Sequence, residues 1–282
     1  MELYTTITSL QNVLKAAHSK GLKIGFVPTM GALHQGHLSL VETAGSMCDI
    51  VVVSIFVNPT QFNDKNDLAN YPRTLEADMK LLSTTRCEYI FSPTVEEVYP
   101  VPDARKFDFG NLEAVMEGAF RPGHFNGVAQ VVSRLFEIVL PDMAFFGRKD
   151  FQQMAIIRDL VRQMNFPIEI VACDIIREKD GLAMSSRNKL LLPEYRDCAP
   201  KIYQTLRDAK YLANLKTVSE IKEYVLNQIN ATQLLRVEYF EIVDETTLMS
   251  VESWNEPGTK VGCIAVYAGK VRLIDNIILD IN

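Results

Sequence analysis

The chain has 282 residues, and its 48% hydrophobic and 23% charged residues are typical of a globular protein. This length is enough for two domains of about 100–200 residues each. The formal net charge is −6 and no long basic run is present, so we expect no nucleic-acid partner. No apolar run is long enough to span a bilayer, and the first residues do not resemble a signal peptide, so we expect no membrane association.

The cysteines are odd in number and scattered along the chain, with no Cys-x-x-Cys pair. They are Cys48, Cys87, Cys173, Cys198 and Cys263. This pattern predicts free thiols rather than disulfides or zinc ligands, and a reducing compartment. We therefore expect a cytoplasmic protein.

Apolar periodicity predicts alternating strands and helices in the first part of the chain. We expect strands at 24–27, 50–57, 89–91, 144–146 and 168–173, and helices at 5–20, 38 onward, 75–84, 126–139 and 151–163. Thr8 is a candidate cap for the first helix, and the polar residues 63–73 predict a loop. Strands that alternate with helices form βαβ units, so a parallel sheet follows.

The pattern changes near Ile176. Two helical patterns lie between Pro193 and Asn230, split around 215–217. Three alternating apolar segments follow at 237–243, 261–267 and 271–279, with a hairpin turn at 268–270. The sequence therefore predicts a second, smaller α+β domain at 176–282 after a first domain at 1–175.

The most informative stretch is 24–41, where a short apolar run is followed by a turn and a helical pattern. His34 and His37 lie three residues apart, which places both imidazoles on one face of the first helical turn. Gly36 between them lets a flat group approach the backbone, and a helix N-terminus attracts anions. These features predict a nucleotide-binding site. The alternative is a surface helix with two solvated histidines.

Other polar residues gather where the predicted strands end, at 28–31, 58–61, 147–150 and 177–188. Ligands of open parallel sheets bind beyond the carboxyl ends of the strands. Ser185, Ser186 and Arg187 suit phosphate oxygens, because hydroxyls donate and a guanidinium binds them as a planar fork.

Each of these features alone has a plainer interpretation. Gln61 and Gln153 could face solvent, Lys149 and Asp150 could form a surface ion pair, and Ser185 with its neighbour could cap a helix. Their common placement at strand ends favours nucleotide or phosphoester chemistry. The chain has neither Gly-x-Gly-x-x-Gly nor a Walker lysine loop, which argues against a dinucleotide oxidoreductase or a P-loop enzyme.

At these residues the chain resembles the pantothenate synthetases, which are pantoate–β-alanine ligases of the nucleotidyltransferase superfamily. His34-Gln35-Gly36-His37 matches the His-x-Gly-His signature, and Met184-Ser185-Ser186-Arg187-Asn188 is similar to the family's form of the Lys-Met-Ser-Lys-Ser loop. Segments 28–34, 56–62, 121–127 and 179–182 are also similar to this family. The resemblance implies an α/β fold, with a Rossmann-like parallel-sheet nucleotidyltransferase domain followed by a smaller α+β C-terminal domain that acts as a lid.

The resemblance also implies the reaction. ATP and pantoate would give pantoyl adenylate and pyrophosphate with Mg²⁺, and β-alanine would then displace AMP to give pantothenate. The implied catalytic residues are His34, His37, Lys149, Ser185, Ser186 and Arg187, with His37 as proton donor. The implied ATP-binding residues are Met30, Gly31, Ala32, Leu33, His34, Gln35, Gly36, His37, Gly147, Arg148, Lys149, Asp150, Ile176, Met184, Ser185, Ser186 and Arg187.

For pantoate and β-alanine, the resemblance implies hydrogen bonds from Gln61 and Gln153, and an apolar wall from Val131 and Val132. It implies a homodimer, and it names no protein ligand for Mg²⁺. Three positions depart from the common family pattern. This chain has Gln35 where the family often has Asp, Arg148 where it commonly has Glu, and Phe151 where it commonly has Tyr.

Two other functions remain open at this point. One is a nucleotidyltransferase that transfers AMP or CMP to another acid or phosphate, which the two glutamines disfavour. The other is a nucleotide-binding regulator without turnover, which would not need His37, Lys149 or the Ser-Ser-Arg loop.

Overall fold

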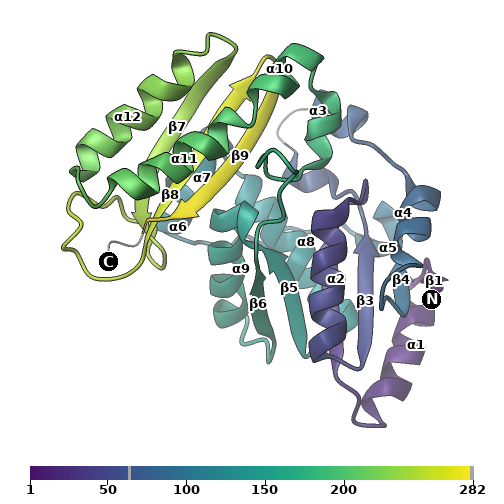
Figure 1. The fold of residues 1–282 in the computed structure, drawn as a ribbon. Coiled ribbons are helices and arrows are strands. Elements are labelled where there is room, and N and C mark those ends of the chain that lie inside the picture. The colour runs from purple at the N-terminus through teal and green to yellow at the C-terminus, as the bar shows by residue number, and fades with distance from the viewer. Residues whose placement is uncertain (63–64, 280–282) are drawn as a thin grey trace. The chain divides into compact units, whose positions relative to one another are not determined.

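The computed structural model describes residues 1–62 and 65–279 (Figure 1). The chain divides into two compact units. The first comprises Met1–Glu113, Glu117–Arg148 and Gln153–Asp174, and the second comprises Ala114–Met116, Lys149–Gln152 and Ile175–Asn282. Each unit is described by itself below.

The first unit is built on a sheet of six strands in the order β1-β4-β3-β2-β5-β6. The strands are β1 (Glu2–Tyr4), β2 (Ile24–Thr29), β3 (Ile50–Ile55), β4 (Tyr89–Phe91), β5 (Met143–Gly147) and β6 (Glu169–Cys173). Every pair of neighbours is parallel, which confirms the predicted parallel sheet. β1 was not predicted, because a strand of three residues, two of them exposed, shows no readable period.

The connections of this sheet are mostly helical. They are α1 (Ile7–His18), α2 (Gln35–Met47), η1 (Pro59–Gln61), α3 (Lys65–Asn70), α4 (Leu75–Leu82), α5 (Val95–Val98), α6 (Asn111–Ala114), α7 (Met116–Phe120), α8 (His124–Val139), η2 (Arg148–Asp150) and α9 (Phe151–Gln163). The predicted loop at 63–73 is wrong where α3 forms, and its residues 63–64 lie outside the described residues.

The predicted cap of α1 is also wrong. Thr6, not Thr8, has the extended backbone of an N-cap, and its hydroxyl accepts the Ser9 N–H. Thr8 is already the second residue of the helix, whereas an N-cap residue directly precedes the first helical residue.

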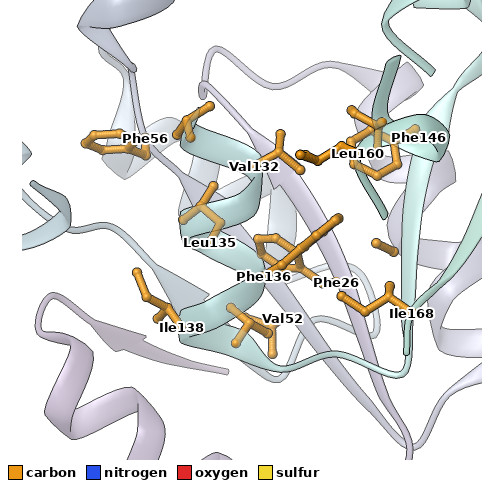
Figure 2. Packing of buried hydrophobic residues seen from close by; sticks show 14 of the residues in the cluster. Phe26, Val52, Phe56, Val132, Leu135, Phe136, Ile138, Phe146, Leu160 and Ile168 are labelled. Carbon is orange, nitrogen blue, oxygen red and sulfur yellow. The ribbon is translucent and has the colours of Figure 1, made fainter. Parts of the chain in front are cut away.

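Helices cover both faces of the six-stranded sheet, as a parallel sheet requires. Phe26 of β2 packs with Phe136 of α8 and Leu160 of α9 on one face (Figure 2). Val27, the next residue of β2, packs with Val41 of α2 on the other face. Successive strand residues point to opposite faces, so the nearly continuous apolar strands are explained by burial on both sides.

The second unit contains an antiparallel sheet in the order β7-β8-β9. Its elements are η3 (Ser186–Leu190), α10 (Pro193–Cys198), α11 (Lys201–Leu212), α12 (Val218–Asn230), β7 (Leu235–Asp244), β8 (Lys260–Ala268) and β9 (Val271–Ile278). The predicted hairpin turn joins β8 to β9 through Gly269, whose φ of 60° suits glycine.

The prediction of two helical patterns before this sheet is wrong in number, because three helices form. The chain breaks at Pro200, which lacks the N–H needed to continue a helix from α10 into α11. Leu206 of α11 and Ile221 of α12 pack against Ile264 of β8, so helices cover one side of the small sheet. The predicted α/β fold with a smaller α+β C-terminal part is thus confirmed. Within the described residues, none of the helices has the length and apolarity to cross a membrane.

Candidate active site

The order of strands changes direction around β2, which lies between β3 and β5. In open α/β sheets, ligands bind outside the carboxyl ends of the strands at such a switch point. The segments that leave these three strands carry Met30 to His37, Asn58 to Gln61, and Gly147 with Arg148. The fold therefore brings the predicted residues of the first unit to one edge of the sheet.

The two histidines cap helix α2. His34 is the N-cap residue, and its Nδ1 accepts the Gly36 N–H at 3.1 Å. His37 reaches back, and its Nδ1 accepts the His34 N–H at 3.3 Å. The ring centroids are 4.1 Å apart. Because Nδ1 accepts in both rings, the hydrogen of each neutral imidazole lies on Nε2, which makes Nε2 a donor. The alternative of two merely solvated histidines does not fit this reciprocal arrangement.

The turn between β2 and the histidines is held by a buried carboxylate that the sequence did not reveal. Asp78 of α4 is 1% exposed. Its oxygens accept the N–H groups of Ala32 at 3.0 Å and Leu33 at 2.8 Å. Gly31 and Ala32 both have positive φ, 81° and 51°. Asp78 thus supports a backbone conformation that non-glycine residues rarely adopt.

Gln61 ends the short helix η1, which packs on the first turns of α8. His124 Nδ1 lies 2.8 Å from the Gln61 carbonyl, and since a carbonyl can only accept, this nitrogen donates. Asn58 Nδ2 donates to the Gly127 carbonyl at 3.1 Å. A Cβ on Gly127 would lie 2.4 Å from the Thr60 oxygen, so only glycine permits this approach.

Gln61 Nε2 is 2.9 Å from the sulfur of Met30, so a predicted substrate-binding residue contacts a predicted ATP-binding residue.

The other predicted substrate-binding residues of the first unit lie on helices. Val131 and Val132 of α8 are 6% and 5% exposed and belong to the core of this unit, where Figure 2 shows Val132. Most of their surface is used in packing, so any wall that they offer is small. Gln153 lies half-buried in the first turn of α9.

Segment 147–150 ends β5 and forms η2. Arg148 Nε lies 3.6 Å from Asp174 Oδ1 in the first unit. In the second unit, Lys149 Nζ lies 3.6 Å from Asp150 Oδ1, and the lysine side chain is 18% exposed. The predicted ion pair exists, but its distance is long and Asp150 is exposed, so it contributes little to stability.

Residues 176–184 form a hairpin in the second unit. Met184 N–H donates to the Ile176 carbonyl at 2.9 Å, and Arg177 bridges to Ala183. These contacts bring together Ile176 and Met184, two of the predicted ATP-binding residues. The hairpin leads directly into η3, where Ser185 is the N-cap and accepts the Arg187 N–H at 3.3 Å. Ser185 therefore does cap a helix, as the plainer interpretation held.

No group of three or more potential metal ligands from His, Cys, Asp and Glu occurs in the described part of the chain, residues 1–62 and 65–279. The five cysteines carry free thiols, as predicted.

Comparison with known proteins decides the family. The model of the family described as Pantoate-beta-alanine ligase matches residues 2–278. The chain belongs to this family. A pantothenate synthetase of Bacteroides fragilis (strain YCH46) is 57% identical over 277 residues, covering 98% of each chain. One from Porphyromonas gingivalis (strain W83) is 54% identical over 277 residues, covering 98% of this chain and 99% of the other.

Solved structures of proteins from this family have the same fold as this chain. A pantothenate synthetase from Thermus thermophilus superposes with a TM-score of 0.93 at 42% identity, covering 99% of each chain. A pantoate-beta-alanine ligase from Francisella tularensis, complexed with beta-gamma ATP and beta-alanine, gives a TM-score of 0.84 at 36% identity, covering 100% of this chain and 99% of that one. The predicted family, fold, enzyme class and function as an ATP-dependent pantoate–β-alanine ligase are confirmed. The roles of individual residues stay predictions.

Proposed function

We propose that this pantoate–β-alanine ligase works through the residues that the sequence singled out, in two half-reactions. The pantoate carboxylate attacks the α-phosphorus of ATP, which gives pantoyl adenylate and releases pyrophosphate. The amine of β-alanine then attacks the acyl carbon and releases AMP. Activation is needed because a carboxylate oxygen is a poor leaving group, whereas AMP is a good one. The reciprocal capping of α2 by His34 and His37 is the observation that carries the proposal.

The histidines bind phosphate oxygens through Nε2–H. Their Nδ1 atoms are occupied by backbone N–H groups, so each ring has a fixed orientation and tautomer before ATP arrives. Donors that need no reorganisation stabilise developing charge best. The positive end of the α2 dipole adds to this stabilisation. His37, the predicted proton donor, donates its Nε2–H as a hydrogen bond to an oxygen of the leaving pyrophosphate and keeps that hydrogen, because its Nδ1 accepts the His34 N–H.

Residues of the second unit neutralise the remaining phosphate charge. Lys149 and Arg187 supply positive charge, and Ser185 and Ser186 supply hydroxyl donors for the β- and γ-phosphates. Ile176 and Met184, paired across the hairpin, contact the adenine and ribose, together with Met30, Gly147 and Asp150.

Pantoate binds to the amides of Gln61 and Gln153. The Gln61 amide comes from a segment whose backbone is fixed by His124 and Asn58, which favours a defined orientation. Val131 and Val132 contact the gem-dimethyl group through the small surface that they expose.

Four further features belong to this proposal. Mg²⁺ enters on the phosphates of ATP, since this ion commonly binds substrate phosphates and keeps several waters. The protein is cytoplasmic and forms a homodimer. Residues 1–175 form the domain that binds ATP and pantoate, and 176–282 form the smaller domain.

The test is a pyrophosphate-release assay with ATP and Mg²⁺, first with pantoate alone and then with β-alanine. We expect one equivalent of pyrophosphate per active site with pantoate alone, and steady turnover with AMP formation once β-alanine is added. His37→Ala and Lys149→Ala should each lower the burst rate by about 10²-fold or more, the scale of one lost charge-stabilising group.

His18→Ala and Lys15→Ala are the matched controls, because both side chains are exposed on α1. Their burst rates should equal that of the parent chain. Unchanged rates in His37→Ala and Lys149→Ala would refute the assigned roles. A burst with phosphorylated acids but not with pantoate would favour the AMP- or CMP-transferring alternative, and ATP binding without any burst would favour the regulator.

A further inference from the structure

Strand β9 holds two segments that lie far from it in the sequence. Asp275 and Asn276 are neighbours in this strand and are 4% and 7% exposed. Asp275 binds Arg177, which is 98 positions earlier, and Asn276 binds the backbone of Lys149, which is 127 positions earlier. All four residues belong to the second unit. Arg177 and Lys149 lie in the two segments that carry its proposed phosphate-binding groups.

The contact between Asp275 and Arg177 is a fork of two hydrogen bonds. Arg177 Nη1 donates to Oδ2 at 2.7 Å, and Nη2 donates to Oδ1 at 3.0 Å. The side chains are 3% and 17% exposed. Burial raises the pKa of Asp275, and the charges of Arg177 and Lys149 oppose that rise. A planar fork fixes direction as well as distance, so this pair orients the guanidinium closely.

Arg177 in turn holds the hairpin. Its Nη1 also donates to the Gly181 carbonyl at 3.2 Å, and its guanidinium carbon lies 3.6 Å from the ring centroid of Tyr203 on α11. Its backbone bridges to Ala183, two residues before Ser185. Asp275 therefore fixes both strands of the hairpin that leads into η3, because it orients the Arg177 side chain that contacts them.

Asn276 acts on the opposite face of β9, because successive strand residues alternate. Leu273 and Leu279 pack in the core of this unit. Asp275 is separated from each of them by an even number of positions, so it lies on the same, core-facing side of the strand. Asn276 Nδ2 donates to the Lys149 carbonyl at 3.1 Å. One strand thus contacts the hairpin with one face and the Lys149 backbone with the other.

We propose that Asp275 and Asn276 are positioning residues for adenylate formation, which set the distance between Lys149 and the Ser185–Arg187 loop. This inference rests on the proposed roles of Lys149 and of that loop. β9 pairs with β8 from Val271 to Ile278, so one hydrogen-bonded strand carries both contacts. A displacement of about 1 Å in such groups can cost 10²-fold in rate.

The experiment compares Asp275→Asn and Asn276→Ala with two matched controls in the full chain. Glu238→Gln removes the charge from another ion pair of β9, in which Arg272 Nε donates to Glu238 Oε2 at 2.8 Å and the glutamate is 12% exposed. Asn230→Ala removes another asparagine, whose Oδ1 accepts the Val237 N–H at 3.0 Å.

We expect the rate constant of the pyrophosphate burst to fall about 100-fold in Asp275→Asn and about 10-fold in Asn276→Ala, with both controls within about twofold. The KM for pantoate should stay within about twofold in all four, because the glutamines that bind it are untouched. A merely structural role would lower the burst amplitude, which counts active molecules, and leave the rate constant unchanged. If Asp275→Asn does not fold, Asn276→Ala decides alone.

A burst rate constant within twofold of the controls in Asn276→Ala would overturn the inference. The Kd for ATP, measured by titration with ATP alone, separates this outcome from a failure of the proposed function. ATP binding can be measured without pantoate, so it tests the positioning role even if the acid is wrong. We expect the Kd for ATP to rise at least about fivefold in both variants relative to their controls. If the parent chain releases no pyrophosphate with pantoate, the proposed function fails, and an unchanged Kd for ATP in both variants would then refute the positioning role as well.

Discussion

Removal of the Asp78 carboxylate should destabilise the first unit strongly. Asp78→Ala deprives the N–H groups of Ala32 and Leu33 of their acceptor, and the Thr74 hydroxyl loses its contact at 3.2 Å. Hydrogen bonds to a charged group contribute about 1.5–3 kcal/mol each, so the two buried backbone bonds together are worth about 3–6 kcal/mol. The strained turn at Ala32, with φ of 51°, would also lose its support.

Urea unfolding at pH 7, followed by circular dichroism, measures this effect. We expect the unfolding free energy of Asp78→Ala to fall by about 3–6 kcal/mol, and that of Asp78→Asn by about half as much, since the amide keeps one acceptor. Glu76→Ala is the matched control, because Glu76 is exposed in the first turn of the same helix, and its change should be under about 1 kcal/mol. A loss below about 1 kcal/mol in Asp78→Ala would refute the reasoning.

Two further predictions concern the segment that carries Gln61, and also Tyr99, whose hydroxyl donates to Asn58 Oδ1 of that segment at 3.1 Å. Gly127→Ala should destabilise the protein by about 1–3 kcal/mol and raise the KM for pantoate, because the new Cβ would lie 2.4 Å from the Thr60 carbonyl; an unchanged KM and melting temperature would contradict this packing. Burial raises the pKa of Tyr99 to about 12, whereas an unfolded tyrosine titrates near pH 10, so stability is fully present below pH 10 and is lost as the pH rises toward 12. Tyr99→Phe should flatten the fall in unfolding free energy over this range, and an equally steep fall in the variant would show that Tyr99 does not cause it.

The sequence by itself determined the helices and strands that have a clear apolar period. It also showed which polar residues stand at the ends of these elements. The helix at 151–163 has the predicted bounds, and the parallel sheet followed from alternating apolar runs. His34 and His37 were predicted as a pair because their spacing in one helical turn is a local property. The cap of α1 and the break at Pro200 were missed, although both signals are local.

Only the tertiary structure decided which residues support the proposed catalytic groups. Asp78 holds a turn 45 and 46 positions away, and Asn276 holds the Lys149 carbonyl from 127 positions away. No periodicity links such pairs, because their meeting depends on how sheets and helices pack rather than on neighbours in the chain. In the sequence, an Asp on a helix is expected to face solvent. Its burial can be predicted only when the loop whose N–H groups it binds is known. The sequence therefore indicated the proposed reacting groups, whereas the fold specified what holds these residues in place.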